Sequence, residues 1–188
     1  LITGAYGQLG ISLNEILSIN HEVYNSGINV SQNKNGFHLN IQDRVQVKNL
    51  INHIEPGLII NLAALTNVDF CESNHELAYE VNTNGVRNIY DCFKGKIIQL
   101  STDYVFDGQK GPYSEEDQTN PISVYGKTKL KAEKIILNSR KNLVLRTNVL
   151  YDISMNNKAS FLNWIIESLE RKNKINVVID QYNNPTWV

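Results

Sequence analysis

The sequence predicts an α/β fold, in which a doubly wound parallel sheet of the Rossmann type carries helices on both faces. Apolar runs of strand length alternate with segments of helical spacing along the 188 residues, and such alternation is typical of parallel sheets. The run GLIINLAA at 57–64 is continuous and mostly apolar, as expected for a strand buried on both faces. Polar stretches follow the expected strands, at the edge where such sheets bind ligands.

The first third of the chain contains the shortest expected elements. LIT at 1–3 ends a strand, and a second strand is expected at 22–27. A helix behind the first strand is indicated by apolar residues at helical spacing, namely Leu9, Leu13, Ile16 and Leu17. The stretch 27–40 is rich in Asn and Gly and is expected to be a loop. Asp43 can cap a helix that carries Val47, Leu50, Ile51 and Ile54.

The rest of the chain continues the alternation. Helices are expected at 75–93, 123–138 and 159–171. Further strands are expected at 96–101, 142–150 and 175–180. The sequence opens inside a strand and stops soon after another, so we expect one domain that is truncated at both ends.

The composition argues against several classes of protein. Hydrophobic residues make up 41% of the chain and charged residues 20%, which are globular values. A formal net charge of −1 gives no reason to expect nucleic acid or an anionic membrane as a partner. No apolar run approaches the roughly 20 residues of a membrane span. Cys71 and Cys92 have no metal-binding spacing, so we expect reduced thiols, no metal site and a cytoplasmic protein.

The glycine-rich stretch TGAYGQLG joins the first strand to the first helix. Gly4, Gly7 and Gly10 stand three residues apart, and glycine lets backbone N–H groups approach a phosphate closely. The positive N-terminus of the helix would then face a pyrophosphate. Because a strand precedes the triplet and a helix follows it, a dinucleotide is favoured over an ordinary turn. Gln8 and Leu9 lie in the same stretch and are expected to contact the cofactor.

The second strand indicates only weakly which nucleotide is bound. An acidic residue at its end would hold the adenosine ribose, but EVYNSG offers Asn25 and Ser26 instead. This uncharged site is compatible with the 2′-phosphate of NADP. No arginine stands beside it, so NADP(H) is favoured only slightly and NAD(H) stays an alternative. Asn40 and Ile41 are expected to line the adenine pocket, with ordinary loop residues as the alternative.

Two polar motifs are candidates for chemistry. STDYVFDG places Ser101, Thr102 and Asp103 at the end of a strand, either as turn chemistry or as part of an active site. YGKTK places Tyr125 and Lys129 four residues apart, on one face of a helix. A lysine ammonium lowers the pKa of a neighbouring phenol. The tyrosine can then protonate a carbonyl oxygen as hydride reaches the carbon.

These motifs together resemble a known superfamily. Gly-x-x-Gly-x-x-Gly, Tyr-x-x-x-Lys and a preceding Ser/Thr resemble the extended short-chain dehydrogenases/reductases. Within that superfamily STDYVFDG, YGKTKLKAE, NVDFCE and DQYNNPT resemble the dTDP-4-dehydrorhamnose reductase family, along nearly the whole chain. The resemblance implies an NAD(P)-binding Rossmann domain at 1–188, with a smaller C-terminal substrate lobe largely absent. It also implies NADPH-dependent reduction of the 4-keto group of a dTDP-4-keto-6-deoxy sugar, and it is compatible with a homodimer.

The resemblance also implies roles for single residues. Thr102 would hydrogen-bond the keto oxygen of the sugar nucleotide, Tyr125 would donate the proton, and Lys129 would support it and bond the nicotinamide ribose. The residues implied on the cofactor side are Ala63, Ala64 and Ser101. The residues implied on the substrate side are Thr66, Asp103 and Tyr104, with Asp69 nearby. Asn82 and Arg146 have site roles and structural roles as equal alternatives.

Departures from the family pattern leave alternatives open. After Arg-Thr the family usually has Ser-Trp, whereas this chain has Asn148 and Val149, so the exact sugar stays open. A dehydratase usually carries Asp-Glu after the threonine and an epimerase a small residue in place of Asp103, and this chain matches neither. A third alternative is a non-catalytic NADP-binding regulatory subunit resembling that of methionine adenosyltransferase. The intact threonine, tyrosine and lysine favour an enzyme.

Overall fold

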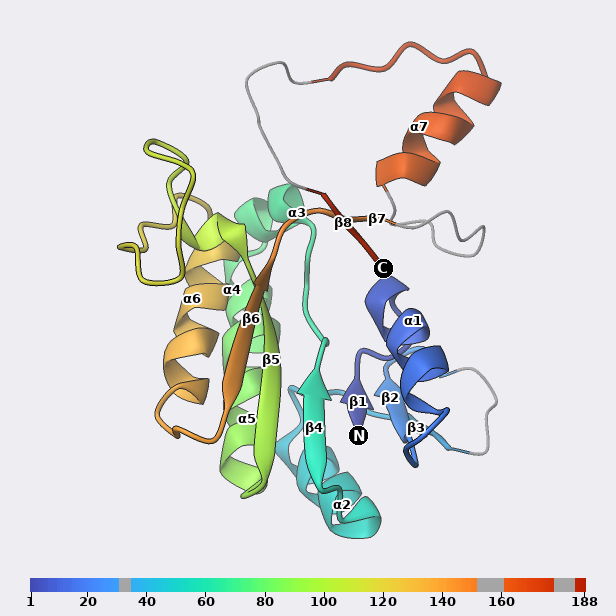
Figure 1. The fold of residues 1–188 in the computed structure, drawn as a ribbon, viewed down its shortest axis with the longest axis vertical. Coiled ribbons are helices and arrows are strands. Elements are labelled where there is room, and N and C mark those ends of the chain that lie inside the picture. Colours follow the sequence, from blue (N-terminus) through green and yellow to red (C-terminus); the bar gives the residue numbers. More distant parts are fainter. Residues whose placement is uncertain (31–34, 152–160, 178–184) are drawn as a thin grey trace.

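The computed structural model describes residues 1–30, 35–151, 161–177 and 185–188. Its centre is a six-stranded sheet in which every neighbouring pair of strands is parallel (Figure 1). The strands are β1 (Ile2–Thr3), β2 (Asn25–Gly27), β3 (Gly36–His38), β4 (Leu58–Asn61), β5 (Lys96–Thr102) and β6 (Leu143–Thr147). Their order, β3-β2-β1-β4-β5-β6, is that of a doubly wound nucleotide-binding sheet, and it confirms the expected fold class.

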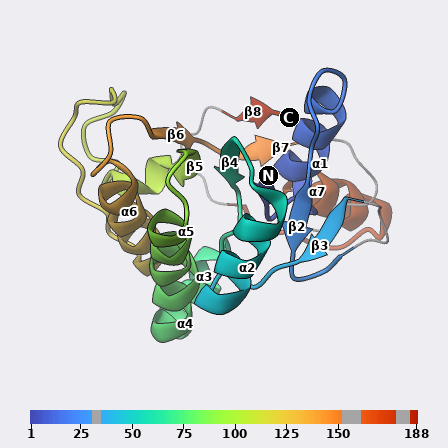
Figure 2. The same ribbon diagram turned by 90° about the horizontal axis from the view of Figure 1, so that it is seen from below.

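Helices pack on both faces of this sheet (Figure 2). Helix α1 (Gln8–Leu17) lies on one face, and α2 (Arg44–Ile54), α5 (Val86–Cys92) and α6 (Val124–Ile136) cover the other. The main core lies under these three helices, because their apolar faces bury the apolar side chains of β4 and β5. Its most buried members are Val47, Ile59, Val86, Ile89, Ile97, Ala132 and Ile136.

Two helix starts show how local sequence fixes these elements. The Asp43 carboxylate accepts hydrogen bonds from the backbone N–H groups of Val45 and Gln46, at 2.9 and 3.1 Å, and so confirms the expected cap of α2. The Ser123 hydroxyl accepts a bond from the N–H of Gly126 at 3.0 Å and caps α6. Capping satisfies N–H groups that have no partner within the helix.

The expected helix at 75–93 is present but irregular in its middle. It consists of α4 (His75–Tyr79), a π-helical segment η1 (Glu80–Gly85) and α5. In the wider π-turn the Asn82 and Thr83 side chains both reach Thr128 of helix α6, at 3.1 and 3.0 Å. Asn82 also exchanges two hydrogen bonds with the backbone of Leu65. The structural role expected for Asn82 is therefore the one that the contacts support.

Several expectations about elements are wrong. The expected loop at 27–40 contains strand β3, and the expected strand at 142–150 divides into β6 and a short β7 (Leu150–Tyr151). Helix α3 (Val68–Ser73) and strand β8 (Thr186–Trp187) were not expected. Of the strand expected at 175–180, residues 175–177 form no regular element, and residues 178–180 lie outside the described residues. The helix expected at 159–171 is present as α7 (Phe161–Glu170).

None of the helices in the described parts of the chain has the length and apolar character that a membrane crossing requires.

Candidate active site

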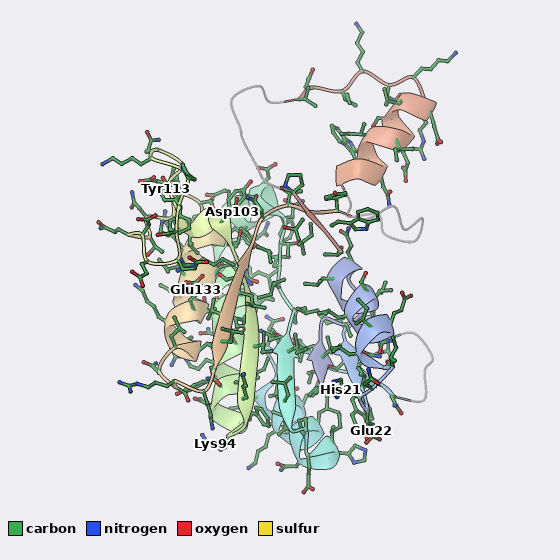
Figure 3. All side chains as sticks on the ribbon, in the orientation of Figure 1. His21, Glu22, Lys94, Asp103, Tyr113 and Glu133 are labelled. Carbon is green, nitrogen blue, oxygen red and sulfur yellow. The ribbon has the colours of Figure 1, made fainter. Side chains whose placement is uncertain are left out.

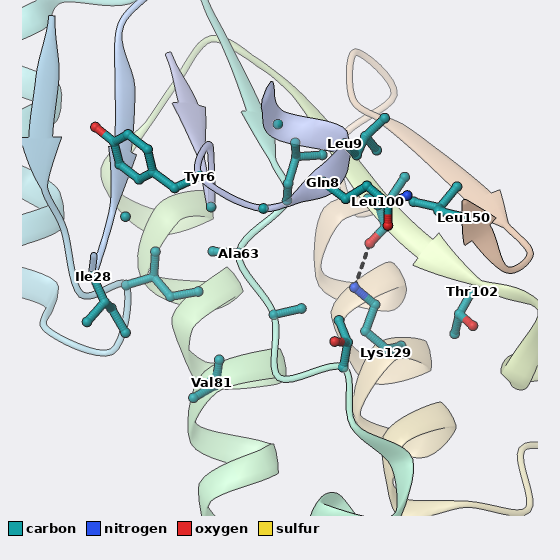
Figure 4. Close-up of a pocket in the computed structure, with 18 of the residues that line it drawn as sticks. Tyr6, Gln8, Leu9, Ile28, Ala63, Val81, Leu100, Thr102, Lys129 and Leu150 are labelled. Atoms are coloured by element: carbon teal, nitrogen blue, oxygen red, sulfur yellow. Dashed lines mark hydrogen bonds between the residues drawn. The ribbon is translucent and has the colours of Figure 1, made fainter. Parts of the chain in front are cut away.

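A cleft of about 590 Å³ lies at the carboxyl ends of the strands, where doubly wound sheets bind ligands (Figure 4). Every residue that the sequence predicted to bind the cofactor lines this cleft: Gly4, Gly7, Gln8, Leu9, Gly10, Asn40, Ile41, Ala63, Ala64, Ser101, Tyr125 and Lys129. Thr66 and Thr102 line it as well. Residues separated by more than 120 positions in the sequence thus meet at one edge of the sheet.

The three glycines of the loop between β1 and α1 differ in what they require. Gly4 has a φ of +66°, and a Cβ there would lie 2.6 Å from the backbone nitrogen of Ala63. A Cβ at Gly10 would lie 2.5 Å from the carbonyl oxygen of Ala5. The chain itself therefore requires glycine at both positions. At Gly7 the nearest atom to a Cβ is 3.4 Å away, so this glycine leaves free space at the start of α1.

The residues considered for the adenosine ribose lie elsewhere than expected. Asn25 and Ser26 are buried inside β2, where Asn25 bonds Asn14 and Ser26 bonds the Ile2 carbonyl, and neither lines the cleft. The residues that line the cleft after β2 are Ile28 and Asn29. The second strand ends at Gly27, as expected, but the cleft meets the residues at and after this end rather than Asn25 and Ser26 inside the strand. Neither lining side chain carries a charge.

Ser101, at the end of β5, belongs to a buried ion-pair cluster. Its hydroxyl donates a hydrogen bond to Glu133 Oε1 at 2.5 Å, and the same carboxylate receives two bonds from Arg146 at 2.9 and 2.7 Å. The Glu133 side chain is 2% exposed and that of Arg146 21%. In Figure 3 Glu133 lies between α6 and β6. The contacts of Arg146 thus support its structural role, because its guanidinium serves to pair Glu133.

Tyr125, on the first turn of α6, is held on the helix side of the cleft. Its ring packs with Cys71, Ala78 and Val124, and it meets Tyr104 edge to face at 5.8 Å between ring centroids. Burial raises the pKa of Tyr125 to about 12, while a hydrogen bond with Thr102 acts in the opposite direction. The sequence predicted a lowered pKa because of the neighbouring lysine. The difference arises because desolvation by burial is the largest influence on the phenol, followed by the hydrogen bond with Thr102 and the negative charge of Asp103.

Lys129 is also buried, one turn further along the same helix. Its Nζ donates a hydrogen bond of 2.6 Å to the carbonyl oxygen of Leu100, as the dashed line in Figure 4 shows. Burial lowers the pKa of Lys129 to about 8, and the negative charge of Glu133 partly opposes that shift. The lysine therefore changes its charge near neutral pH.

The expected substrate residues do not all reach the cleft. Asp103 and Tyr104 form the 3-10 turn η2 (Asp103–Val105) after β5 and do not line the cleft. Asp103 accepts a hydrogen bond from the Thr102 hydroxyl at 3.1 Å, and burial raises the pKa of its carboxyl group. Asp103 lies just beyond the carboxyl end of β5 (Figure 3). Asn148 lines the cleft, whereas Val149 and Asp69 do not.

Some lining residues were missed by sequence reasoning. Tyr6, Gln42, Val81, Thr147 and Leu150 all line the cleft. Thr147 and Leu150 could have been found from their place after a strand, because the carboxyl ends of parallel strands share one edge. Val81 belongs to the π-helical segment, and no sequence signal places it there. In the described parts of the chain, no group of three His, Cys, Asp or Glu side chains could hold a metal ion.

Comparison with known proteins identifies the family. The family described as RmlD substrate binding domain matches residues 1–188. The chain belongs to this family. Two curated relatives of this RmlD-family chain carry different names. A dTDP-4-dehydrorhamnose reductase of Aggregatibacter actinomycetemcomitans is 36% identical over 100% of the chain and 62% of its own length. A methionine adenosyltransferase 2 subunit beta of Xenopus tropicalis is 34% identical over 100% of the chain and 58% of its own length.

The fold of the RmlD-family chain also matches solved structures. The structure of a dTDP-4-dehydrorhamnose reductase from Bacillus anthracis, in complex with NADP, matches with a TM-score of 0.85 at 34% identity. The match covers 99% of this chain and 64% of that chain. The chain thus spans about three-fifths of the length of the relatives that it matches.

Proposed function

We propose that the chain is the NAD(P)-binding domain of a reductase that uses NADPH to reduce the 4-keto group of a dTDP-4-keto-6-deoxy sugar, as in dTDP-L-rhamnose synthesis. One observation carries the proposal: the glycine loop, Thr102, Tyr125 and Lys129 line one cleft. Relatives named as reductases of dTDP-4-keto sugars support the substrate class.

The cleft fits a nicotinamide dinucleotide. The open space at Gly7 and the N-terminus of α1 suit a pyrophosphate, because free backbone N–H groups and the positive end of the helix dipole meet there. Gln8 Nε2 lies buried at this point without a hydrogen-bond partner among the described residues, and it can donate to a phosphate oxygen. The small side chains of Ala63 and Ala64 leave room beside the cofactor. The matching Bacillus anthracis reductase was solved in complex with NADP, and the uncharged Ile28 and Asn29 suit that nucleotide without requiring it.

The bound dinucleotide would supply the hydride, and the side chains of the chain would handle the proton. Because burial raises the pKa of Tyr125 to about 12, its phenol keeps its proton at neutral pH and can donate it to the developing alkoxide. Thr102 would donate a hydrogen bond to the same oxygen. Lys129, positively charged below about pH 8, would stabilise the phenolate that remains. Thr66, Asp103 and Tyr104 are proposed to shape the sugar site.

A second candidate function is a binding role without turnover. It is favoured by the relative named as a subunit of methionine adenosyltransferase, which matches over the whole chain. That reading predicts tight NADP binding by the full-length protein, no oxidation of NADPH with keto sugars, and a stable complex with another protein.

The test mixes the full-length protein with dTDP-4-keto-L-rhamnose and either NADPH or NADH, and follows the loss of reduced-nicotinamide absorbance. We expect oxidation that depends on the sugar and is faster with NADPH. Tyr125→Phe should lower kcat by about 100-fold or more while NADPH still binds, because the proton donor is lost. Full activity of that variant would contradict the role of Tyr125, and cofactor binding without oxidation would favour the second candidate.

A further inference from the structure

A row of polar side chains crosses the middle of the sheet, inside the core. Thr3 of β1, Asn61 of β4 and Gln99 of β5 are 1%, 0% and 1% exposed. They occupy paired positions on neighbouring strands, since Thr3 pairs with Asn61 and Asn61 with Gln99. Paired positions in a parallel sheet direct their side chains to the same face. Three buried polar side chains in register are costly to desolvate unless each finds a partner.

The row is a chain of hydrogen bonds that all run in one direction. The Thr3 hydroxyl donates to Asn61 Oδ1, and Asn61 Nδ2 donates to Gln99 Oε1 at 2.6 Å. Gln99 Nε2 then donates to the carbonyl oxygen of Leu100 at 2.8 Å. Aligned hydrogen bonds polarise one another, so the last N–H group is a stronger donor than an isolated amide.

The row ends on the carbonyl that also holds the lysine of the cleft. Leu100 O accepts the bond from Gln99 Nε2 and the 2.6 Å bond from Lys129 Nζ. The pairing of β5 with β4 ends at Gln99, opposite Asn61, whereas on its other side β5 stays paired with β6 as far as Thr102. The row thus ends on a carbonyl that also holds a side chain of the candidate active site.

We propose that Thr3, Asn61 and Gln99 are positioning residues for Lys129, acting through the Leu100 carbonyl. The row fixes the carbonyl oxygen that holds Nζ at the cleft. It also shares that oxygen with the ammonium, because two donors on one carbonyl weaken each other's bond. The ammonium thus stays in place at the cleft, on an oxygen that a second donor also occupies. The proposal rests on the proposed function only for the chemical role of Lys129.

The charged groups around the lysine are accounted for separately. Glu133, on the same helix, raises the pKa of Lys129, and it is itself paired with Arg146 of β6. Asp103 lies on the turn after β5 and bonds Thr102. Tyr125 lies on the same helix with its proton retained. None of the proposed positioning residues touches these groups, so substitutions in the row leave the surrounding charges unchanged.

The test measures the pKa of Lys129 directly, in the full-length protein without substrate. The lysine ε-carbons are labelled with ¹³C and titrated by NMR, and the Lys129 signal is assigned from its loss in Lys129→Arg. Gln99→Met removes the competing donor at similar volume. We expect the pKa of Lys129 to rise by about half a unit to one unit, the effect of one hydrogen bond. Thr3→Val, at the far end of the row, should raise it by less, and Thr3→Ser, which keeps the hydroxyl, should leave it unchanged.

Ile97→Val is the matched control, because Ile97 is 1% exposed and lies two residues before Gln99 on the same face of β5. It should reduce stability without moving the pKa of Lys129. A pKa in Gln99→Met that equals that of Ile97→Val, or that falls, would overturn the proposal. If Gln99→Met does not fold, the pKa of Lys129 is compared between Thr3→Val and Thr3→Ser. Equal pKa values in these two variants would then overturn the proposal. A protein that fails to reduce the keto sugar would contradict the proposed function. The titration of Lys129 would still test the positioning role, because it is measured without substrate.

Discussion

At the scale of single residues, burial sets the chemistry of the cleft. The phenol of Tyr125 and the ammonium of Lys129 lie on consecutive turns of one helix, and desolvation moves both groups toward their neutral forms. For the phenol this means keeping its proton, and for the lysine it means losing one within reach of physiological pH. The two pKa values, about 12 and about 8, therefore lie about four units apart. As the pH rises, the lysine loses its charge well before the phenol loses its proton.

The charge of Lys129 should control cofactor binding at alkaline pH. Because its pKa is lowered to about 8, the ammonium is present below that pH and is lost above it. We expect the Kd for NADPH to be constant from about pH 7 to about pH 8 and to increase by up to tenfold per pH unit above that, as measured by NADPH fluorescence. Lys129→Met should bind more weakly and lose this dependence. If that variant keeps the same pH profile, another group is responsible.

The glycine loop gives a second prediction at this scale. A side chain at Gly7 meets no close atom of the chain but enters the space assigned to the pyrophosphate. Gly7→Val should therefore fold and bind NADPH about tenfold to a hundredfold more weakly, the effect of inserting bulk into a fitted site. Gly57→Val is the control, since nothing lies within 4 Å of a Cβ at Gly57, outside the cleft. Calorimetric titration with NADPH measures the Kd of both folded variants. Equal Kd values would contradict the assignment of the space at Gly7 to the pyrophosphate.

At the scale of elements, helix α6 carries Tyr125 and Lys129, and its first turn is fixed by contacts on several sides. The Val124 N–H donates to Glu72 of α3 at 2.6 Å, and Ser123 caps the helix. Gly126 allows the helix to approach the backbone of Tyr104, because a Cβ there would overlap the Tyr104 carbonyl oxygen. These contacts explain why Tyr125 stands in a defined place between α3 and η2.

A pair of cap variants can separate stability from catalysis. Ser123→Ala and Asp43→Ala each remove an N-cap, so each should lower the free energy of unfolding by about 0.5–2 kcal/mol in urea titrations. Only Ser123→Ala loosens the turn that carries Tyr125, so only that variant should also lower kcat. Equal kcat values in the two variants would indicate that other contacts are sufficient to hold Tyr125.

The elements also show how far sequence reasoning reached. Long periodic segments such as α2 and α6 were predicted within a few residues, because their apolar spacing and caps are local signals. Strand β3 was missed because its three residues, Gly36–His38, gain their structure from pairing with β2. Helix α3 was missed because six residues are too few for a periodic pattern. The predicted residues at several strand ends do line one cleft, whereas the direction of the Tyr125 pKa shift depends on packing that no motif encodes.

At the scale of the whole molecule, the cluster around Glu133 joins the helix layer to the sheet and to the loop beyond it. Glu133 of α6 binds Ser101 of β5 and Arg146 of β6. Arg146 in turn donates to the carbonyl of Glu115 at 3.2 Å and lies 5.1 Å from the centre of the Phe106 ring. One buried carboxylate thus connects helix α6, the sheet and, through Arg146, the loop that contains Glu115.

Removal of that carboxylate should be strongly destabilising. Glu133→Gln leaves the guanidinium of Arg146 without its charged partner, so we expect unfolding to become easier by about 3 kcal/mol, near the low end for buried pairs because the arginine is partly exposed. Asp91→Asn breaks the exposed pair with Arg44 and should cost at most about 1 kcal/mol. Urea denaturation of both variants measures the contrast, and equal losses would show that Glu133 contributes no more than a surface charge.

Apart from Val81, the cleft is assembled from two separate stretches of the sequence. Residues 4–66 supply the glycine loop and the proposed nucleotide side, and residues 100–150 supply most of the groups proposed to act on the substrate. Over evolutionary time, substitutions at the ends of β5 and β6 can therefore alter the proposed substrate side while the proposed nucleotide side is inherited unchanged.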